Sequence, residues 1–397
     1  MNIIFLTLVE INSIEDRGIY QDLLRKFRDE GHDVTIVTPV ERRRKISTNF
    51  SNKEGISILQ VKTFNIQKTN IIEKGIGTLA IEYQYLAAIK RYSSHKKYDL
   101  VLYSTPPITF AKVIEFVKKR DDAKSYLLLK DIFPQNAVDM NMLKKGSFLH
   151  RQFVRKEKKL YQISDTIGCM SPANVNFVLK HNPEIDSRKV EVNPNTIEPV
   201  NFEYSQEQKI SIREKYDIPL HKKILVYGGN LGKPQGLDFL LETIQNTKYD
   251  EAFFLIVGNG TEFPKIEKWF KDNNPKNAKL LQKLPKEDYD QLLAACDVGL
   301  IFLDKNFTIP NFPSRLLSYL EMKMPVIAAT DLNTDIGDII ENANCGYKVI
   351  AGKQEEMQMK LGLMLEKDLK EMGNNAEKLL LNNYTIDQSY RLIIEKI

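Results

Sequence analysis

Short apolar runs of strand length alternate with helix-periodic segments along this 397-residue chain, and this alternation constrains the fold more than any other feature. Residues 2–9 form a continuous apolar run, as expected of a parallel strand that is buried on both faces. Apolar residues then recur at helical spacing from Tyr20 to Phe27, and a second strand is predicted over 33–38, ended by Pro39. A strand–helix–strand unit of this length predicts a right-handed βαβ crossover.

The same pattern continues to the end of the chain and predicts two domains. A first Rossmann-like domain is expected over 1–198 and a second over 199–384, joined by a linker near 197–209. One long helix is predicted over 355–381, and a last helix over 385–397 is expected to pack back on the first domain. The fold class is therefore α/β, with two doubly wound domains that face one another across a cleft, and ligands are expected beyond the carboxyl ends of the strands.

Composition excludes several classes of protein. Hydrophobic residues make up 42% and charged residues 27%, which excludes a largely disordered chain. The three cysteines form no C-x-x-C pair, so a disulfide scaffold or zinc ribbon is not expected and a reducing cytosol fits. No apolar run approaches the ~18–20 residues of a membrane span, and the N-terminus lacks the basic start of a signal peptide. A cytoplasmic protein is expected.

The net charge of +5 hides an asymmetry between the two halves of the chain. Residues 1–200 carry 32 Lys and Arg against 23 Asp and Glu (+9), and residues 201–397 carry 25 against 29 (−4). Basic stretches at 41–45, 118–120 and 151–159 are interleaved with aromatic residues. They predict contact with an anionic membrane surface, where each cation contributes ~1 kcal/mol, and ordinary solvated charge is the alternative. No recognition motif for nucleic acid is present.

Two glycine loops follow predicted strands of the second domain. Glycine lets the backbone approach a ligand closely, and the N–H groups of such a loop can bind phosphate. A tight turn without a ligand explains each loop equally well, and neither is a P-loop. The first loop is followed by a lysine that is either a second phosphate-binding cation or a solvated side chain. The candidate residues are Gly229, Asn230, Leu231, Gly232, Lys233, Gly258 and Gly260.

A proline, a serine and an arginine open a predicted helix further along. Pro313 suits the first helical position, so Ser314 and the adjacent N–H groups are expected at the helix N-terminus, where an anion is favoured. Arg315 adds a guanidinium that can form two hydrogen bonds to phosphate. A plain helix start with a surface arginine is the alternative.

Two acidic positions in the first domain are candidates for proton transfer. Asp131, after Lys130 at the end of a predicted strand, could orient a hydroxyl or take its proton, or could cap the following turn. Glu157 lies on the apolar stripe of a basic helix over 150–162, where it either faces a site or reaches out to water. The five histidines show no H-x-H or H-E-x-x-H spacing, and no metal ligand is predicted.

With these residues the sequence resembles the GT-B glycosyltransferases, and among them the retaining glycosyltransferase family 4. Gly31–Thr38 is similar to the family's second strand, and Pro325–Ala328 to its "PV" strand. A narrower resemblance is to bacterial enzymes that assemble O-antigen and capsule repeat units, including N-acetylfucosamine-type transferases. The segments that carry it are Gly18–Tyr20, Lys130–Pro134, Gly229–Gly232 with Gln235 and Gly236, and Pro313–Arg315 with Leu317–Tyr319.

This chain departs from the family pattern at several positions. The family's E-x7-E pair falls on Pro310 and Ser318, and its usual Arg and Lys after the first strand of the second domain fall on Asn230 and Gln235. Glu321 stands three residues from the place of the ribose-binding carboxylate.

The resemblance then implies that other groups bind the donor pyrophosphate: Arg315, Lys233 and helix-terminal N–H groups. It adds Gly18, Leu284 and Ser318 to the nucleotide-binding candidates, beside Pro313 and Ser314. The family's frequent histidine of the first domain falls near Lys130, so Lys130, Asp131 and Arg315 are the catalytic candidates.

The resemblance implies transfer of a sugar, an N-acetylated amino or deoxyamino sugar, from a UDP-sugar to an undecaprenyl-diphosphate-linked saccharide. It implies retention of anomeric configuration, with no metal or further cofactor. The first domain is expected to bind the acceptor on the inner face of the cell membrane, and the second to bind the nucleotide sugar. A GT-B UDP-N-acetyl sugar 2-epimerase and a non-catalytic nucleotide-sugar-binding protein are the alternatives.

Overall fold

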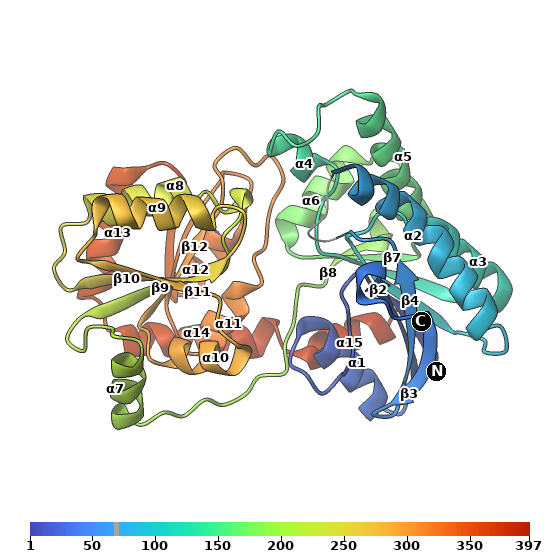
Figure 1. Cartoon of the computed structure of the whole chain (residues 1–397), viewed down its shortest axis with the longest axis horizontal. Coiled ribbons are helices and arrows are strands. Elements are labelled where there is room, and N and C mark those ends of the chain that lie inside the picture. Colours follow the sequence, from blue (N-terminus) through green and yellow to red (C-terminus); the bar gives the residue numbers. More distant parts are fainter. Residues whose placement is uncertain (67–70) are drawn as a thin grey trace. The chain divides into compact units, whose positions relative to one another are not determined.

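The computed structural model describes residues 1–66 and 71–397, and for residues 71–76 it describes the backbone alone. The chain divides into two compact units (Figure 1). Unit 1 comprises Met1–Glu198 together with Thr385–Ile397, and unit 2 comprises Pro199–Tyr384. Each unit is built on a sheet of its own.

The sheet of unit 1 has eight strands in the order β3-β4-β2-β1-β5-β6-β7-β8, and every pairing in it except β3 with β4 is parallel. The strands are β1 (Asn2–Leu6), β2 (Asp33–Glu41), β3 (Asn49–Lys53), β4 (Ile56–Thr63), β5 (Leu100–Ser104), β6 (Lys124–Leu129), β7 (Thr166–Cys169) and β8 (Val190–Val192). The helices are α1 (Ile19–Asp29), α2 (Ile71–Tyr92), α3 (Ala111–Asp121), α4 (Gln135–Asp139), α5 (Phe148–Ile163), α6 (Pro172–His181) and α15 (Ile386–Ile394).

Alternate side chains of each central strand pack on opposite faces of this sheet. In β1, Ile4 and Leu6 join the core under α2 and α3, whereas Ile3 and Phe5 join the core under α1 and α15. Figure 1 shows these two pairs of helices on opposite faces of the sheet. Because both faces are covered, the strand sequence is apolar throughout, as the sequence predicted.

The prediction that Pro39 ends the second strand is wrong. β2 continues to Glu41, and Pro39 lies opposite Val61 of β4. On its other side β2 pairs with β1 only as far as Val37. Beyond that point β2 has one neighbour, so the missing N–H of proline leaves no pairing bond unmade.

Unit 2 has six parallel strands in the order β11-β10-β9-β12-β13-β14. The strands are β9 (Lys223–Asn230), β10 (Ala252–Asn259), β11 (Ala278–Gln282), β12 (Val298–Phe302), β13 (Val326–Thr330) and β14 (Gly346–Ile350). The helices are α7 (Gln206–Lys215), α8 (Leu237–Asn246), α9 (Phe263–Asn273), α10 (Lys286–Ala294), α11 (Arg315–Glu321), α12 (Ile336–Asn342), α13 (Gln354–Glu366) and α14 (Leu369–Asn383).

Three expectations for helix ends differ from the structure. The single helix expected over 355–381 is two helices, because Asp368 accepts hydrogen bonds from the N–H groups of Lys370 and Glu371 and so starts α14. The expected linker contains the start of α7, whose Ser205 forms a capping box. Thr385 precedes α15 but makes no side-chain capping bond to any described residue.

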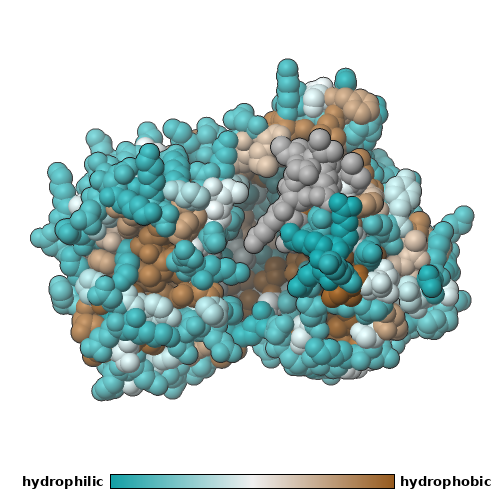
Figure 2. All heavy atoms as spheres, viewed as in Figure 1, coloured by the Kyte–Doolittle hydropathy of each residue, from teal (hydrophilic) through white to brown (hydrophobic). Residues whose placement is uncertain are grey.

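Numbered within each unit, the sheet of unit 2 follows the order 3-2-1-4-5-6 of a doubly wound fold, and the sheet of unit 1, setting aside the antiparallel strand β3, follows the same order with a seventh strand at its end. The predicted α/β class with two Rossmann-like units is therefore confirmed. In such sheets the chain reverses direction between strands 1 and 4, and a crevice forms there at the carboxyl ends. This point lies between β1 and β5 in unit 1 and between β9 and β12 in unit 2. The face drawn in Figure 2 is mostly hydrophilic, with hydrophobic side chains in scattered groups.

Candidate functional site

The last residues of β9 and the loop after it lie at the carboxyl edge of the sheet of unit 2. Gly229 adopts a φ of +114°, which side chains disfavour, and a Cβ added there would meet no atom within 4 Å. Asn230 is exposed beside it, and Gly232 is buried. The backbone at Gly229 is thus bent and bare, which suits the close approach of a ligand.

The second glycine loop, after β10, has a different reason for its glycines. A Cβ on Gly258 would lie 2.0 Å from the carbonyl oxygen of Gly229, and one on Gly260 would lie 2.3 Å from that of Leu231. Leu231 itself is buried in the core, and its N–H donates to the Asn259 carbonyl oxygen at 3.0 Å. Gly258, Gly260 and Leu231 therefore hold the two loops against one another.

Arg315 lies at the point where the sheet reverses. Its Nη2 donates to Gln235 Oε1 at 2.6 Å, and its guanidinium carbon lies 4.3 Å from the centre of the Tyr227 ring. Its Nη1 is buried and has no hydrogen-bond partner among the residues described. A buried guanidinium nitrogen without a partner is costly unless an anion or another acceptor completes it.

Tyrosine hydroxyls fix the surroundings of this guanidinium. Tyr227 donates to the same Gln235 oxygen at 3.2 Å. Tyr319, on α11, donates to the Leu300 carbonyl oxygen of β12 at 3.2 Å and accepts the N–H of Gly228 in β9 at 3.3 Å. Tyr319 thus ties the two strands that flank the reversal point.

The helix expected to open at Pro313 begins two residues later. Pro313 and Ser314 precede α11, and their carbonyl oxygens accept the N–H groups of Leu316 and Leu317. Ser314 is exposed and forms no side-chain capping bond to a described residue. Ser318 and, after β11, Leu284 are half-buried. The glutamate near the family's ribose position, Glu321, is buried and accepts the Val200 N–H at 2.9 Å.

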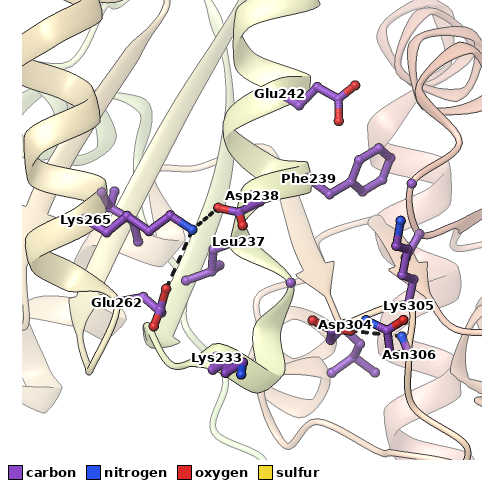
Figure 3. A pocket seen from close by; sticks show the side chains of 15 residues that line it. Lys233, Leu237, Asp238, Phe239, Glu242, Glu262, Lys265, Asp304, Lys305 and Asn306 are labelled. Atoms are coloured by element: carbon purple, nitrogen blue, oxygen red, sulfur yellow. Dashed lines mark hydrogen bonds and ion pairs between the residues drawn. The ribbon is translucent and has the colours of Figure 1, made fainter. Parts of the chain in front are cut away.

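A cavity of about 570 Å³ opens beside this cluster, where the loops after β9, β10, β12 and β14 meet (Figure 3). Lys233 lines it, whereas Arg315 does not. Figure 3 shows the Lys265 amine between the carboxylates of Asp238 and Glu262, with which it forms ion pairs. Arg315 nevertheless bonds to Gln235, which follows Lys233 by two residues in the chain.

In unit 1, Lys130 and Asp131 follow β6 and contact different groups. Lys130 Nζ donates to the Asn193 carbonyl oxygen at 3.4 Å, and burial lowers its pKa to about 7. Asp131 Oδ2 accepts from Asn136 Nδ2 at 2.6 Å, and burial raises the Asp131 pKa to about 6. Gly18, also in unit 1, donates its N–H to Asp22 Oδ1 at 3.2 Å ahead of α1.

Glu157 is half-buried and does not reach out to water as a solvated surface carboxylate would. Burial raises its pKa to about 7, and its Oε1 accepts the Tyr161 hydroxyl at 3.1 Å. A second pocket, of about 140 Å³, lies against it. Its place on the apolar stripe of the helix was the sequence signal. The roles of Gln235 and Tyr227, by contrast, had no such signal.

Known proteins resemble this chain in sequence and in architecture. Residues 208–379 match the family model "Glycosyl transferases group 1". WbjE of Pseudomonas aeruginosa, named as a glycosyltransferase, is 23% identical over 80% of this chain and 78% of its own length. WcaI of Escherichia coli strain K12, named for colanic acid biosynthesis, is 23% identical over 79% of each chain. The chain is a glycosyltransferase.

Solved structures show the same fold for this glycosyltransferase. The structure of HepE of Anabaena in complex with UDP matches this chain with a TM-score of 0.72 and 14% sequence identity. The match covers 99% of HepE and 100% of this chain. WaaG, a glycosyltransferase of lipopolysaccharide biosynthesis, has a TM-score of 0.65 at 14% identity over 98% of this chain and 99% of its own. The GT-B-like fold implied by the resemblance is thus confirmed.

The described residues offer neither a metal cluster nor a membrane-spanning helix. They contain no cluster of three or more His, Cys, Asp or Glu side chains placed to hold a metal ion. Among the helices of the described part of the chain, none is long and apolar enough to cross a membrane.

The raised pKa of Glu157 predicts a pH-dependent effect of its substitution. The carboxyl titrates near 4.5 when unfolded and near 7 when folded, so ionisation opposes folding increasingly from about pH 4.5 to pH 7. Glu157→Gln removes this cost and should raise the unfolding free energy by about 1–3 kcal/mol at pH 8, with little effect at pH 4.5. Urea melts at both pH values measure the difference.

Glu184→Gln is the matched control for this experiment. Glu184 pairs with Lys158 at the surface, and the ion pair lowers its pKa, so its substitution should slightly reduce stability at pH 8. An equal loss of stability for Glu157→Gln at both pH values would show that the Glu157 carboxyl is well solvated.

Proposed function

We propose that this glycosyltransferase moves a sugar from a UDP-sugar to a hydroxyl of an undecaprenyl-diphosphate-linked saccharide, with retention of anomeric configuration. The donor sugar is proposed to be an N-acetylated amino or deoxyamino sugar, and the product a repeat unit of a surface polysaccharide. The names of WbjE and WcaI, and the complexes of HepE with UDP and with UDP-glucose, support this class of reaction. Unit 2 is proposed to bind the donor and unit 1 the acceptor.

The observation that carries the proposal is the half-satisfied guanidinium of Arg315. One outer nitrogen is fixed by Gln235, and the other is buried without a partner among the described residues. A diphosphate would supply both the missing acceptor and the counter-charge. The bent, open backbone at Gly229 lies at the end of β9, just before the loop that carries Gln235, so N–H groups of this stretch can add to the same anion.

The proposed reaction is a front-face displacement. The bond between the anomeric carbon and the β-phosphate oxygen breaks, and UDP leaves with the electron pair. The acceptor hydroxyl oxygen bonds to the anomeric carbon on the same face, and its proton passes to the departing diphosphate. Negative charge grows on the diphosphate in the transition state, and a pre-positioned guanidinium stabilises it there.

In unit 1, the two residues after β6 are proposed to serve the acceptor. The raised pKa of Asp131, about 6, lets it accept a hydrogen bond from a hydroxyl and share its proton near neutral pH. The lowered pKa of Lys130, about 7, leaves much of its amine uncharged at that pH. Lys130 can therefore orient a sugar hydroxyl with only part of its charge, whereas Asp131 is mostly ionised near pH 7 and can accept the hydroxyl's hydrogen bond as a carboxylate.

Removal of the guanidinium should impair turnover while the fold persists. Arg315→Ala is expected to lower kcat at least roughly tenfold, a conservative reading of the 10²–10³ lost with one such donor. Arg315→Lys keeps the charge but loses the two-nitrogen geometry, so its kcat should lie between those of wild type and Arg315→Ala. Lys271→Ala, which removes an exposed cation of α9, is the control and should leave kcat unchanged. Turnover of Arg315→Ala within twofold of wild type would remove Arg315 from the mechanism.

The reaction itself is tested with a panel of nucleotide sugars. A donor should stabilise the protein against heat by RT ln(1 + [L]/Kd), and that donor should then be consumed in the presence of lipid-linked saccharides. Release of free UDP with a new glycosidic product supports transfer. Formation of an epimer from UDP-N-acetylglucosamine alone would instead identify a 2-epimerase.

The segment between α4 and α5, together with the first two turns of α5, is proposed to touch the anionic inner leaflet of the cell membrane. Met142, Phe148 and Leu149 expose 70%, 71% and 47% of their surfaces, although they are apolar. Exposed cations surround them along the segment: Lys144, Lys145, Arg151 and Arg155. Apolar side chains that insert between lipid headgroups while cations meet anionic lipid are typical of peripheral membrane binding.

Substitution of the apolar pair should weaken binding to membranes. The double variant Phe148→Ser, Leu149→Ser is expected to bind vesicles of anionic phospholipid at least roughly tenfold more weakly, since burial of a Phe or Leu contributes about 1.5–3 kcal/mol. Co-sedimentation of the protein with these vesicles at low and high salt measures the binding. Leu332→Ser, which removes an apolar side chain 75% exposed in unit 2, is the control. Equal binding of wild type and double variant would exclude this segment as the contact.

A further inference from the structure

The pocket beside Glu157 is walled by three segments of unit 1: the loop after β6, α5 and α6. Its volume is about 140 Å³. A protein cavity of roughly 150 Å³ accommodates one six-membered ring. Ile132, Val154 and Val178 give it an apolar lining. The pocket is thus sized for a single small ring with an apolar face.

One wall carries a pair of stacked rings. Phe177 and His181 on α6 have ring centres 4.0 Å apart and planes inclined by 25°. His181 Nδ1 lies 2.9 Å from the Phe177 carbonyl oxygen, which can only accept, so Nδ1 carries the proton and Nε2 is an acceptor in the neutral ring. Stacked rings at a wall present a flat apolar surface with a polar edge.

The opposite helix supplies complementary polar groups. His150 Nδ1 accepts the N–H of Gly146 at 3.3 Å, so Nε2 of the neutral ring is a donor. Glu157 Oε1 accepts the Tyr161 hydroxyl, and Oε2 has no hydrogen bond to the described residues. The pocket therefore offers a donor on His150 and acceptors on His181 and Glu157 around an apolar lining.

The side chains of the pocket disfavour an anion or a lipid chain as its ligand. Lys158, its one lining lysine, is paired with Glu184 at 2.8 Å, so an anion such as phosphate would meet the carboxyl of Glu157 without an unpaired cation. A lipid chain would cover the polar groups of Glu157, His150 and His181 without offering them hydrogen-bond partners, at a cost. A neutral ring with hydroxyls on its edge satisfies them.

We propose that this pocket binds one neutral pyranose ring of the saccharide acceptor, with Glu157 and His181 as the hydrogen-bonding residues and the Phe177–His181 pair as the stacking surface. This inference rests on the proposed function. Ile132, which lines the pocket, follows Asp131 directly in the chain, so the pocket lies in the segment that carries that carboxyl, although Asp131 itself does not line it. Glu157 and His181 would then set which hydroxyl pattern is accepted.

Binding of methyl pyranosides to the full chain tests the proposal. The probes are the methyl glycosides of glucose, galactose, N-acetylglucosamine and fucose at millimolar concentration, observed by saturation-transfer-difference NMR. At least one should receive saturation on its ring protons. Glu157→Leu and Val154→Phe, the second of which fills the pocket, should each weaken binding at least roughly tenfold, the equivalent of 1.4 kcal/mol.

Glu115→Leu is the matched control, because it makes the same chemical change at an exposed ion pair of α3 outside the pocket. It should bind like wild type. Absence of saturation for every probe, or unchanged binding by Val154→Phe, overturns the proposal. A thermal shift with UDP and a transfer assay on the same samples separate the two hypotheses. If UDP binds and the pocket variants bind pyranosides and transfer sugar as well as wild type does, the pocket proposal is refuted and the proposed function stands. Pyranoside binding without UDP binding or transfer refutes the proposed function and leaves the pocket in place.

Discussion

The guanidinium of Arg315 packs on the Tyr227 ring and is hydrogen-bonded through only one of its outer nitrogens, so it needs a further acceptor and a counter-charge. The neighbouring residues at the carboxyl edge of unit 2 hold it in this state. Arg315 is held there because two loops from either side of the reversal point pack tightly. The N–H of Asp304 donates to the Pro234 carbonyl oxygen at 3.0 Å, and Gly236 lies against the backbone of Leu303. Gln235, between these contacts, is thereby fixed and fixes the guanidinium in turn.

The general architecture could be predicted from the sequence because parallel strands buried on both faces leave continuous apolar runs. The details that the sequence analysis did not predict depend on contacts distant in the chain. Pro39 is tolerated because β1 has already ended beside it. Gly258 and Gly260 resemble a ligand loop, yet their bare Cα atoms are needed for packing against Gly229 and Leu231. Neither cause can be seen in a local pattern.

The candidate site was predictable in its positions and not in its electrostatics. Asp131 and Lys130 could be placed at a strand end, where parallel folds gather their ligand-binding groups. Their shifted pKa values, and that of Glu157, follow from burial in the assembled unit. Burial depth is a property of the assembled unit, so a sequence that correctly names a carboxyl does not reveal its charge.

The return of the chain to unit 1 has a consequence for the order in which the protein folds. Ile197 and Thr385 lie side by side, the N–H of Ile386 donates to the Ile197 carbonyl oxygen at 3.0 Å, and Ile393 is fully enclosed in the core under α1. Unit 2 is thus an insertion between two parts of unit 1. Most of unit 1 is translated before unit 2, yet its core under α1 can be completed only after unit 2 has been translated.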